Sequence, residues 1–600
     1  MAGPIPLASH VAAPPGAPLI PIARPQPGPP FAAENFRFRP IGRIGGIVGA
    51  VAAPGALAVL ERALGPNGQL LPPSGRALVA DWDTCWHGDD RIARLDQWQA
   101  IITQGHLAEV EGAFALAWRT ADGCLRLARD GVGERSLYYA PIAEGVVFAS
   151  SVPALLATGV VSRRVNRRAV AAFLSYAYLP GRETLVDGVF EVLPGEIVEF
   201  ERGDFRRRQF WSLPAEPPPA QPHDEASLRV ELRARLERAV RRRLPGGEPV
   251  GVTLSGGIDS SLVVALARRL HDAPVHTYSV SFGPEYPNEL QFSSLVAAHC
   301  GTQHEIVELS PAVVLHHLDE SIGLLSDPIG DPLTVPNALL FREASARVGV
   351  ILNGEGGDPC FGGPKNQPML LAELLGDGAN DPTTDACSRE RSYLRSYLKC
   401  YDDLPDLLAP DLLEALTAEP LEADLGPRFA DERWPSFIGK LFAINVALKG
   451  GHHILPKVEA ESAPFGVLPR SPLFDRSLVE LAFQIPPRFK LRGSIEKYLL
   501  KEAVRDLLPE TIINRPKSGM LVPVEGWFRG PLLPHARERL LDGLATTGLV
   551  RRDYLERLLA GRLGGLRPRH GAKIWLLLTL ESWLRSNSLT GSSAPRTATI

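Results

Sequence analysis

The chain is poor in cysteine and has no long apolar run. Its six cysteines are scattered over 600 residues without a CxxC pair, which argues against a disulfide framework or a cysteine-ligated metal and favours a reducing compartment. The best apolar run, Ile574 to Leu580, is far shorter than the roughly 20 residues that span a bilayer. The N-terminus lacks the basic head and apolar stretch of a signal peptide. We therefore expect a cytoplasmic protein without a membrane segment.

An excess of basic charge is also absent. The formal net charge is −4, so the chain has no global basic footprint for nucleic acid, and we expect no nucleic-acid partner. A composition of 45% hydrophobic and 22% charged residues is typical of soluble globular proteins and argues against wholesale disorder. A length of 600 residues predicts at least two domains.

Proline-rich stretches divide the chain. The head is rich in proline and is expected to stay extended, and a second proline-rich stretch forms a linker. Short strand-like pieces separated by turn residues fill the part between them, among them Ile44–Ala53 and Ala77–Ala80. The predicted segments are the head 1–43, a β-rich domain 44–212, the linker 213–224, a second domain 225–590 and a tail 591–600.

The second part begins with a helix of regular period and then alternates strands with helices. The helix ends in Arg241–Arg243, which we interpret as a solvated helix end rather than a phosphate patch. Strands are predicted at Val250–Leu254, Val275–Phe282 and Arg347–Asn353, with helices between them. This alternation is typical of an α/β fold with a parallel sheet covered by helices on both faces. From about residue 385 to Leu584 the pattern is mostly helical.

The sharpest motif is SGGIDSS at 255–261, between a predicted strand and a predicted helix. Paired glycines let backbone N–H groups converge on an anion, and the helix N-terminus adds partial positive charge. Asp259 cannot face a phosphate unaided, so its presence implies Mg²⁺ between them. The motif is neither a Walker A loop nor GxGxxG. A bland alternative is a glycine-rich turn with a Ser or Asp N-cap.

SGGIDSS resembles the pyrophosphate-binding loop of ATP pyrophosphatases, and further stretches narrow the resemblance to the asparagine synthetase superfamily. They follow one another in the family's order over roughly residues 225–590. The stretches are Asp327-Pro328 to Pro336, Ile351 to Asp358 with Phe361-Gly362-Gly363, Arg470 to Asp475, Leu491-Arg492-Gly493 with Lys497 to Lys501, and Asn514 to Gly519 with Pro523 and Trp527.

This resemblance implies ATP and Mg²⁺ as cofactors, a substrate carboxylate activated as an acyl-adenylate with release of pyrophosphate, and an amine that displaces AMP. Asp259 and Asp358 match the Mg²⁺ ligands, and Lys517 matches the lysine that contacts the phosphates. Leu254 and Val280 match positions that line the adenine site, although both would also pass for core residues. The remaining nucleotide-binding candidates are the loop residues Ser255, Gly256, Gly257, Ser260, Ser261 and Gly354.

Glu355 is the second catalytic candidate. Asparagine synthetases carry glutamate here, where it can orient or deprotonate the amine, whereas β-lactam synthetases have tyrosine. Pro359-Cys360 departs from the family's usual Glu-Leu, so the substrate end of the pocket is expected to differ.

The N-terminal part resembles the family's glutamine amidotransferase (Ntn-type) α+β sandwich, notably in Glu111 to Ala115 and Leu127 to Asp130. An active glutaminase begins Cys-Gly-Ile, and its cysteine is the nucleophile. This chain has Gly45-Gly46-Ile47 there, and its first cysteine is Cys85. The family's glutamine contacts are replaced by Ala80-Asp81-Trp82 and Leu95-Asp96-Gln97. We therefore predict that glutamine hydrolysis is lost.

Three functional hypotheses follow. The first is an ATP-dependent amide ligase that joins a small-molecule or peptide carboxylate to a specialised-metabolite or peptide amine, for example in macrolactam formation, as in β-lactam synthetases and lasso peptide cyclases. The second is synthesis of asparagine from aspartate, ATP and ammonia. The third is a nucleotide-binding pseudoenzyme. The sequence leaves the substrates open, together with the oligomeric state, for which a homodimer is one alternative.

Overall fold

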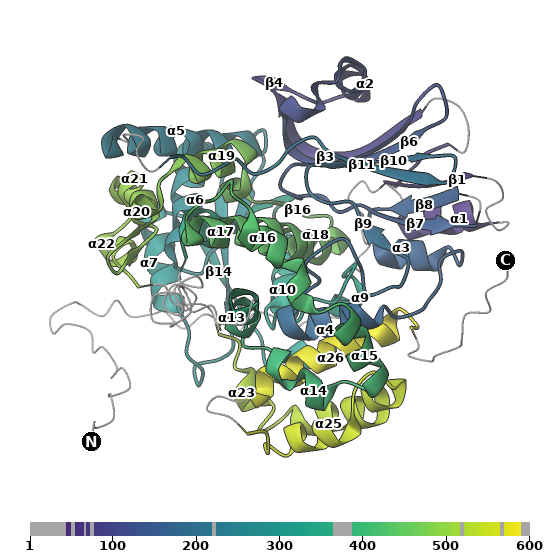
Figure 1. Cartoon of the computed structure of the whole chain (residues 1–600). Helices are drawn as coiled ribbons and strands as arrows, with labels where there is room; N and C mark the ends of the chain where they lie inside the picture. The colour runs from purple at the N-terminus through teal and green to yellow at the C-terminus, as the bar shows by residue number, and fades with distance from the viewer. Residues whose placement is uncertain are drawn as a thin grey trace. The chain divides into compact units, whose positions relative to one another are not determined.

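The structure is a computed structural model (Figure 1). Contacts divide the chain into two units, Met1–Arg37 and Phe38–Ile600, and every described residue lies in the second. The structure describes residues 44–49, 55–64, 68–72, 77–143, 145–218, 224–363, 387–516, 521–564 and 569–589. The predicted head 1–43 and the predicted tail 591–600 lie outside these ranges.

Two mostly antiparallel sheets make up the N-terminal part. The first has the order β2-β1-β8-β7-β9 and consists of β1 (Ile44–Gly49), β2 (Gln69–Leu70), β7 (Tyr138–Ile142), β8 (Gly145–Ala149) and β9 (Phe190–Glu191). The second has the order β11-β10-β6-β5-β3-β4 and consists of β3 (Ala77–His87), β4 (Asp90–Arg91), β5 (Val110–Arg119), β6 (Leu125–Arg129), β10 (Glu196–Glu201) and β11 (Asp204–Gln209).

One buried cluster joins the two sheets face to face. It contains Tyr139 and Phe148 from the first sheet with Ala117 and Leu127 from the second. Helices cover the outer faces: α1 (Ala56–Leu64), α2 (Leu95–Gln104), the turn η1 (His106–Glu109), α3 (Val152–Ala157) and α4 (Arg167–Tyr176). The predicted α+β sandwich is confirmed.

Strand β3 extends to His87, whereas the predicted strand ended at Ala80. Asp81 and Asp83 resemble turn residues in the sequence, yet both are buried in the strand. Each carboxylate pairs with a buried arginine, Asp81 with Arg135 and Asp83 with Arg470. Local sequence therefore hid a strand whose polar residues find distant partners.

The third sheet is entirely parallel, with the order β14-β13-β12-β15-β16. Its strands are β12 (Val250–Thr253), β13 (Val275–Ser281), β14 (Gln303–Glu308), β15 (Val350–Leu352) and β16 (Leu468–Arg470). Helices α5 (Glu225–Arg243), α6 (Ile258–Leu270) and α7 (Leu290–Cys300) pack on one face and α10 (Thr334–Ala344) on the other. The α/β prediction is confirmed, but two strands were missed: β14, and β16, whose three residues include Pro469 and carry no readable period.

The C-terminal part is helical, as predicted, with one short hairpin of β17 (Leu491–Arg492) and β18 (Ile495–Glu496). A helical stretch runs from α17 (Phe437–Ile444) through a π-helix (Asn445–Ile454) to α18 (Leu455–Ser462). Further helices include α13 (Ser388–Ser396), α15 (Pro410–Ala418), α19 (Arg476–Gln484), α21 (Tyr498–Ala503), α25 (Arg552–Leu559) and α26 (His570–Ser586). No helix in the described part of the chain is long and apolar enough to cross a bilayer.

The end of α5 corrects the interpretation of Arg241–Arg243 as solvated for two of the three residues, because only Arg241 is exposed. Arg243 is only 2% exposed and pairs with Glu134 at 2.9 Å and Asp475 at 2.6 Å. Arg242 pairs with Glu111 of β5 at 2.8 Å. These arginines join the sandwich to the parallel sheet, and burial is tolerated because each charge has a partner.

Candidate active site

The SGGIDSS turn, residues 255–261, follows β12 as predicted, but α6 begins within it at Ile258, so Asp259, Ser260 and Ser261 belong to the first turn of the helix. Gly256 has φ +75°, and a Cβ there would lie 2.6 Å from Cβ of Phe292, so only glycine fits this turn. The Ser260 hydroxyl accepts a hydrogen bond from the Ser255 backbone N–H at 3.1 Å and donates to the Gly257 carbonyl at 3.2 Å. The turn is thereby fixed at the start of α6, where helix N–H groups can meet an anion.

The turn after β15 lies directly against this loop. A Cβ on Gly354 would lie 2.5 Å from the Ser260 backbone nitrogen, and one on Gly357 would lie 2.1 Å from a carboxylate oxygen of Asp259. Two glycines therefore let neighbouring strand ends approach closely. Glu355 and Asp358 follow on this turn, and the Glu355 backbone N–H donates to Asn353 at 3.0 Å.

Lys497 joins the two turns. Its ammonium lies 2.5 Å from Asp259 and 2.5 Å from Asp358, and the lysine is 1% exposed. Burial alone would lower the pKa of Lys497, but the two carboxylates raise it above the ordinary lysine value. The β17–β18 hairpin ends immediately before Lys497 and presents it at the start of α21.

Lys497 was not among the predicted catalytic residues. The sequence contained a signal, because Lys497 belongs to one of the motifs shared with the family and the chain has few lysines. Which lysine meets the carboxylates depends on packing, and the motif does not show it. The predicted candidate, Lys517, lies outside the described residues.

The two turns open onto a cavity of about 370 Å³ that lies above the carboxyl ends of the parallel strands. Ligands of open parallel sheets bind at this edge. Eight predicted site residues line it: Leu254, Ser255, Asp259, Ser260, Val280, Gly354, Glu355 and Asp358. Gly256, Gly257 and Ser261 belong to the turn but are not among the lining residues, and Ser261 is completely buried.

A second ion pair lines the same cavity, with its lysine buried and its carboxylate partly exposed. Lys457 of α18 lies 2.7 Å from Asp331, which precedes α10. Burial works against both charges, yet each holds the other ionised: the pKa of Asp331 is lowered well below its usual range and that of Lys457 is raised. Burial lowers the pKa of neighbouring His453 to about 3, so its imidazole is neutral. None of these three residues was assigned a role from the sequence, although Asp331 lies in one of the stretches that resemble the family.

Asp259 and Asp358 fit the divalent ion that the resemblance implies. Their carboxylates come from adjacent strand ends and converge on one ammonium, so oxygen donors of the kind that Mg²⁺ prefers already face a common point. These two residues would hold the ion.

Gly45 stands in the sandwich where active glutaminases of the resembled family have their cysteine nucleophile. Gly45 lies within β1, and a Cβ there would meet Leu64 at 2.9 Å. Cys85 is completely buried and its thiol donates to the Ala113 carbonyl at 3.2 Å. Burial raises the pKa of this thiol well above its usual value, so Cys85 is a structural residue.

Comparisons with known proteins agree with the site. The asparagine synthase family model matches residues 231–585, and a glutamine amidotransferase domain model matches residues 98–211. The chain is 26% identical over 511 residues to glutamine-hydrolyzing asparagine synthetase 1 of Bacillus subtilis, covering 79% of this chain and 78% of that protein.

Two more relatives are similar over most of their length. A putative glutamine-hydrolyzing asparagine synthetase of Mycobacterium tuberculosis is 26% identical over 549 residues, covering 86% of this chain and 81% of that protein. Amidase chyE of Penicillium rubens is 24% identical over 498 residues, covering 71% of this chain and 72% of that protein. Because the asparagine synthase model covers more than half of the residues, the chain belongs to the asparagine synthetase superfamily and is an ATP-dependent amide ligase.

Proposed function

We propose that this ligase activates a substrate carboxylate as an acyl-adenylate and transfers the acyl group to an amine, without hydrolysing glutamine itself. The observation that carries the proposal is the buried Lys497 between Asp259 and Asp358, at the edge of a cavity that also contains Glu355. A charge cluster of this kind suits a reaction in which a polyphosphate leaves.

In the first step, a carboxylate oxygen of the substrate attacks the α-phosphorus of ATP. The bond between this phosphorus and the oxygen that bridges the α- and β-phosphates breaks. Negative charge accumulates on the departing pyrophosphate. The SGGIDSS turn and the N-terminus of α6 would bind the phosphates, and the Lys497 ammonium would neutralise the developing charge. Leu254 and Val280, both nearly buried at the cavity wall, would hold the adenine.

Mg²⁺ bound by Asp259 and Asp358 would supply Lewis-acid stabilisation of the phosphate oxygens. In its presence these carboxylates would serve as ligands, and their position beside the Ser255–Ser261 turn would keep the phosphates in register with the acyl group.

In the second step, the amine nitrogen attacks the acyl carbon and AMP leaves. The nitrogen must lose a proton as the amide forms, and Glu355 is the cavity carboxylate placed beside the nucleotide turn to accept it. Pro359 lines the cavity close to Glu355, in place of the family's usual glutamate, which supports an amine different from that of ordinary asparagine synthetases.

The amine is proposed to enter directly, as a specialised-metabolite or peptide amine. Gly45 supplies no nucleophile, and the buried thiol of Cys85 cannot replace it. Glutamine-dependent transfer would need a reactive cysteine in the sandwich, and neither residue provides one.

The test is ATP–pyrophosphate exchange with the purified chain and Mg²⁺, over a panel of carboxylates that includes aspartate and peptide carboxylates. Exchange with a non-aspartate carboxylate, and amide formed from an amine but not from glutamine, is the expected result. Exchange with aspartate and asparagine formed from ammonia would favour the ammonia-dependent synthetase. The names of two relatives, glutamine-hydrolyzing asparagine synthetases, point to the same product but to glutamine as the nitrogen source. No exchange with any carboxylate would leave the pseudoenzyme.

A further inference from the structure

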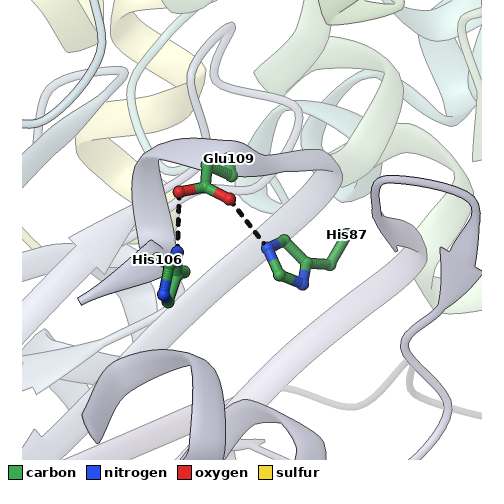
Figure 2. A group of neighbouring side chains, drawn as sticks. All are labelled: His87, His106 and Glu109. Carbon is green, nitrogen blue, oxygen red and sulfur yellow. Dashed lines mark hydrogen bonds and ion pairs between the residues drawn. The ribbon is translucent and has the colours of Figure 1, made fainter. Parts of the chain in front are cut away.

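A group of two histidines and one glutamate lies on the sandwich, apart from the nucleotide cavity (Figure 2). His87 is the last residue of β3, and His106 and Glu109 are the first and last residues of η1. All three side chains are partly exposed, at 36%, 43% and 59%. A solvent ion can therefore reach them.

Glu109 lies between the two imidazoles. One of its oxygens is 3.0 Å from Nε2 of His87 and the other is 2.7 Å from Nδ1 of His106, and Figure 2 shows both rings turned toward the carboxylate. No arginine or lysine pairs with Glu109 among the residues that the structure describes. Among the described residues, the Glu109 carboxylate is therefore paired only with two imidazoles, and imidazole is a side chain that can bind a metal ion.

The arrangement matches the donor set of a zinc site. Two imidazole nitrogens and one carboxylate oxygen are a known ligand set for Zn²⁺, with the fourth position left to water. The three ligand atoms all lie within 4.8 Å of one another, and tetrahedral zinc would hold them roughly 3.3 Å apart. Small rotations of partly exposed side chains close that difference. Imidazole ligands favour Zn²⁺ over Mg²⁺ or Ca²⁺, which prefer oxygen.

Both ligand-bearing segments are attached to helices outside the sandwich, α5 and α19. Arg476 of α19 donates to the carbonyls of Ala108 and Val110, on either side of Glu109, at 2.6 and 3.1 Å. Arg242 of α5 donates to the carbonyl of Gly88, next to His87, at 2.8 Å. A metal ion that joins His87 to η1 would therefore fasten together two segments that the rest of the molecule already holds.

We propose that His87, His106 and Glu109 form a binding site for a zinc-like divalent ion, which staples the β3–β4 turn to η1 at the contact with α5 and α19. The site is independent of the ligase chemistry.

The test is a Co²⁺ and Zn²⁺ titration of the full chain after removal of metals with EDTA. Co²⁺ is expected to bind with the visible absorption of a tetrahedral nitrogen–oxygen site, and Zn²⁺ should displace it and raise the Tm. His87→Gln and His106→Gln should each weaken binding by at least about tenfold and abolish the zinc-dependent rise in Tm. Glu109→Gln should weaken binding in the same direction.

His299→Gln is the matched control, because His299 is exposed and its Nε2 lies 3.2 Å from the Leu507 carbonyl oxygen, outside the proposed ligand group. It should leave both titrations unchanged. Absence of a tetrahedral Co²⁺ spectrum, or a spectrum that persists in His87→Gln and His106→Gln, would overturn the proposal. Equal losses in the His299→Gln variant would overturn it as well. Because the variants lie on a partly exposed surface, their Tm without metal reports whether they fold.

Discussion

The ammonium of Lys497 lies 2.5 Å from a carboxylate oxygen of Asp358, in a place that solvent hardly reaches. Asp259 lies at the same distance on the neighbouring strand end, so one cation joins two loops that are far apart in the sequence. Two carboxylates this close would repel each other without the cation. The lysine therefore holds the site together and also provides its positive charge.

Replacing Lys497 should remove most of the adenylation activity. With Lys497→Met, the rate of ATP–pyrophosphate exchange is expected to fall by about 10²–10³-fold, because the developing pyrophosphate charge loses its partner. Lys440→Met is the control, since Lys440 donates to the Asp431 carbonyl at 2.8 Å and is not among the residues that line the cavity. If the Met variant does not fold, Lys497→Arg serves as the second variant. It keeps the positive charge and tests whether a cation of another shape supports exchange. Unchanged exchange in folded Lys497 variants would contradict the role.

Glu355 should separate the two half-reactions. Glu355→Gln keeps the size and polarity of the side chain but removes the base, so exchange should stay within a few-fold while amide formation falls by about 10²–10⁴-fold. Single-turnover assays that follow AMP and amide formation measure the difference. An equal loss in both steps would place Glu355 in adenylation instead.

Glutamine should not be a nitrogen donor. Incubation with glutamine is expected to release no glutamate above the rate without protein, because Gly45 carries no nucleophile. Cys85→Ser should leave amide formation from a free amine unchanged, since its thiol is buried with a raised pKa. Glutamate release that disappears in Cys85→Ser would refute the assignment of Cys85 as structural.

The Asp331–Lys457 pair should stabilise the fold only while both charges are present, so that removing one of them costs more than its share of the pair. Asp331→Asn or Lys457→Met each leaves one buried charge without its partner, so the free energy of unfolding should fall by on the order of 3 kcal/mol. The double variant should lose less than the sum of the two. Urea unfolding of the four proteins measures this, and strict additivity would show that the pair does not act as a unit.

Acid should weaken the contact between Asp83 and Arg470. Burial would raise the pKa of Asp83, but Arg470, 2.7 Å away, lowers it below its unfolded value of about 3.9. The pair therefore contributes fully above that unfolded value, and its contribution is lost as the pH falls toward the lower folded value. Asp83→Asn should flatten the loss of Tm below about pH 4.

Asp96→Asn is the matched control for this pH series, because Asp96 pairs with Arg94 in full contact with solvent. Exposed pairs contribute little, so its Tm should follow that of the unmodified chain at every pH. Identical pH profiles for Asp83→Asn and the unmodified chain would show that this buried pair does not govern acid stability.

The alternation of strands and helices and the SGGIDSS turn could be predicted from the residues alone, because both follow from local rules: hydrophobic period, the conformational freedom of glycine and the parallel pairing of strands that flank helices. The meeting of Asp259 and Asp358 was implied by the family resemblance, and no local rule makes the first and fourth strands of a sheet neighbours. β12 and β15 are neighbours, which brings Asp259 and Asp358 together.

The partners of the buried charged side chains are known only from the folded structure. Lys497 reaches the carboxylates because a hairpin presents it there, Asp331 meets Lys457 at the cavity wall, and Arg243 turns inward to Glu134 and Asp475. The intrinsic helix propensity and hydration of a lysine or arginine are the same at every position in a sequence. Whether the side chain is buried therefore depends on a counter-charge that is distant in the sequence. Packing energy over the whole fold selects that partner, and no local pattern of residues contains it.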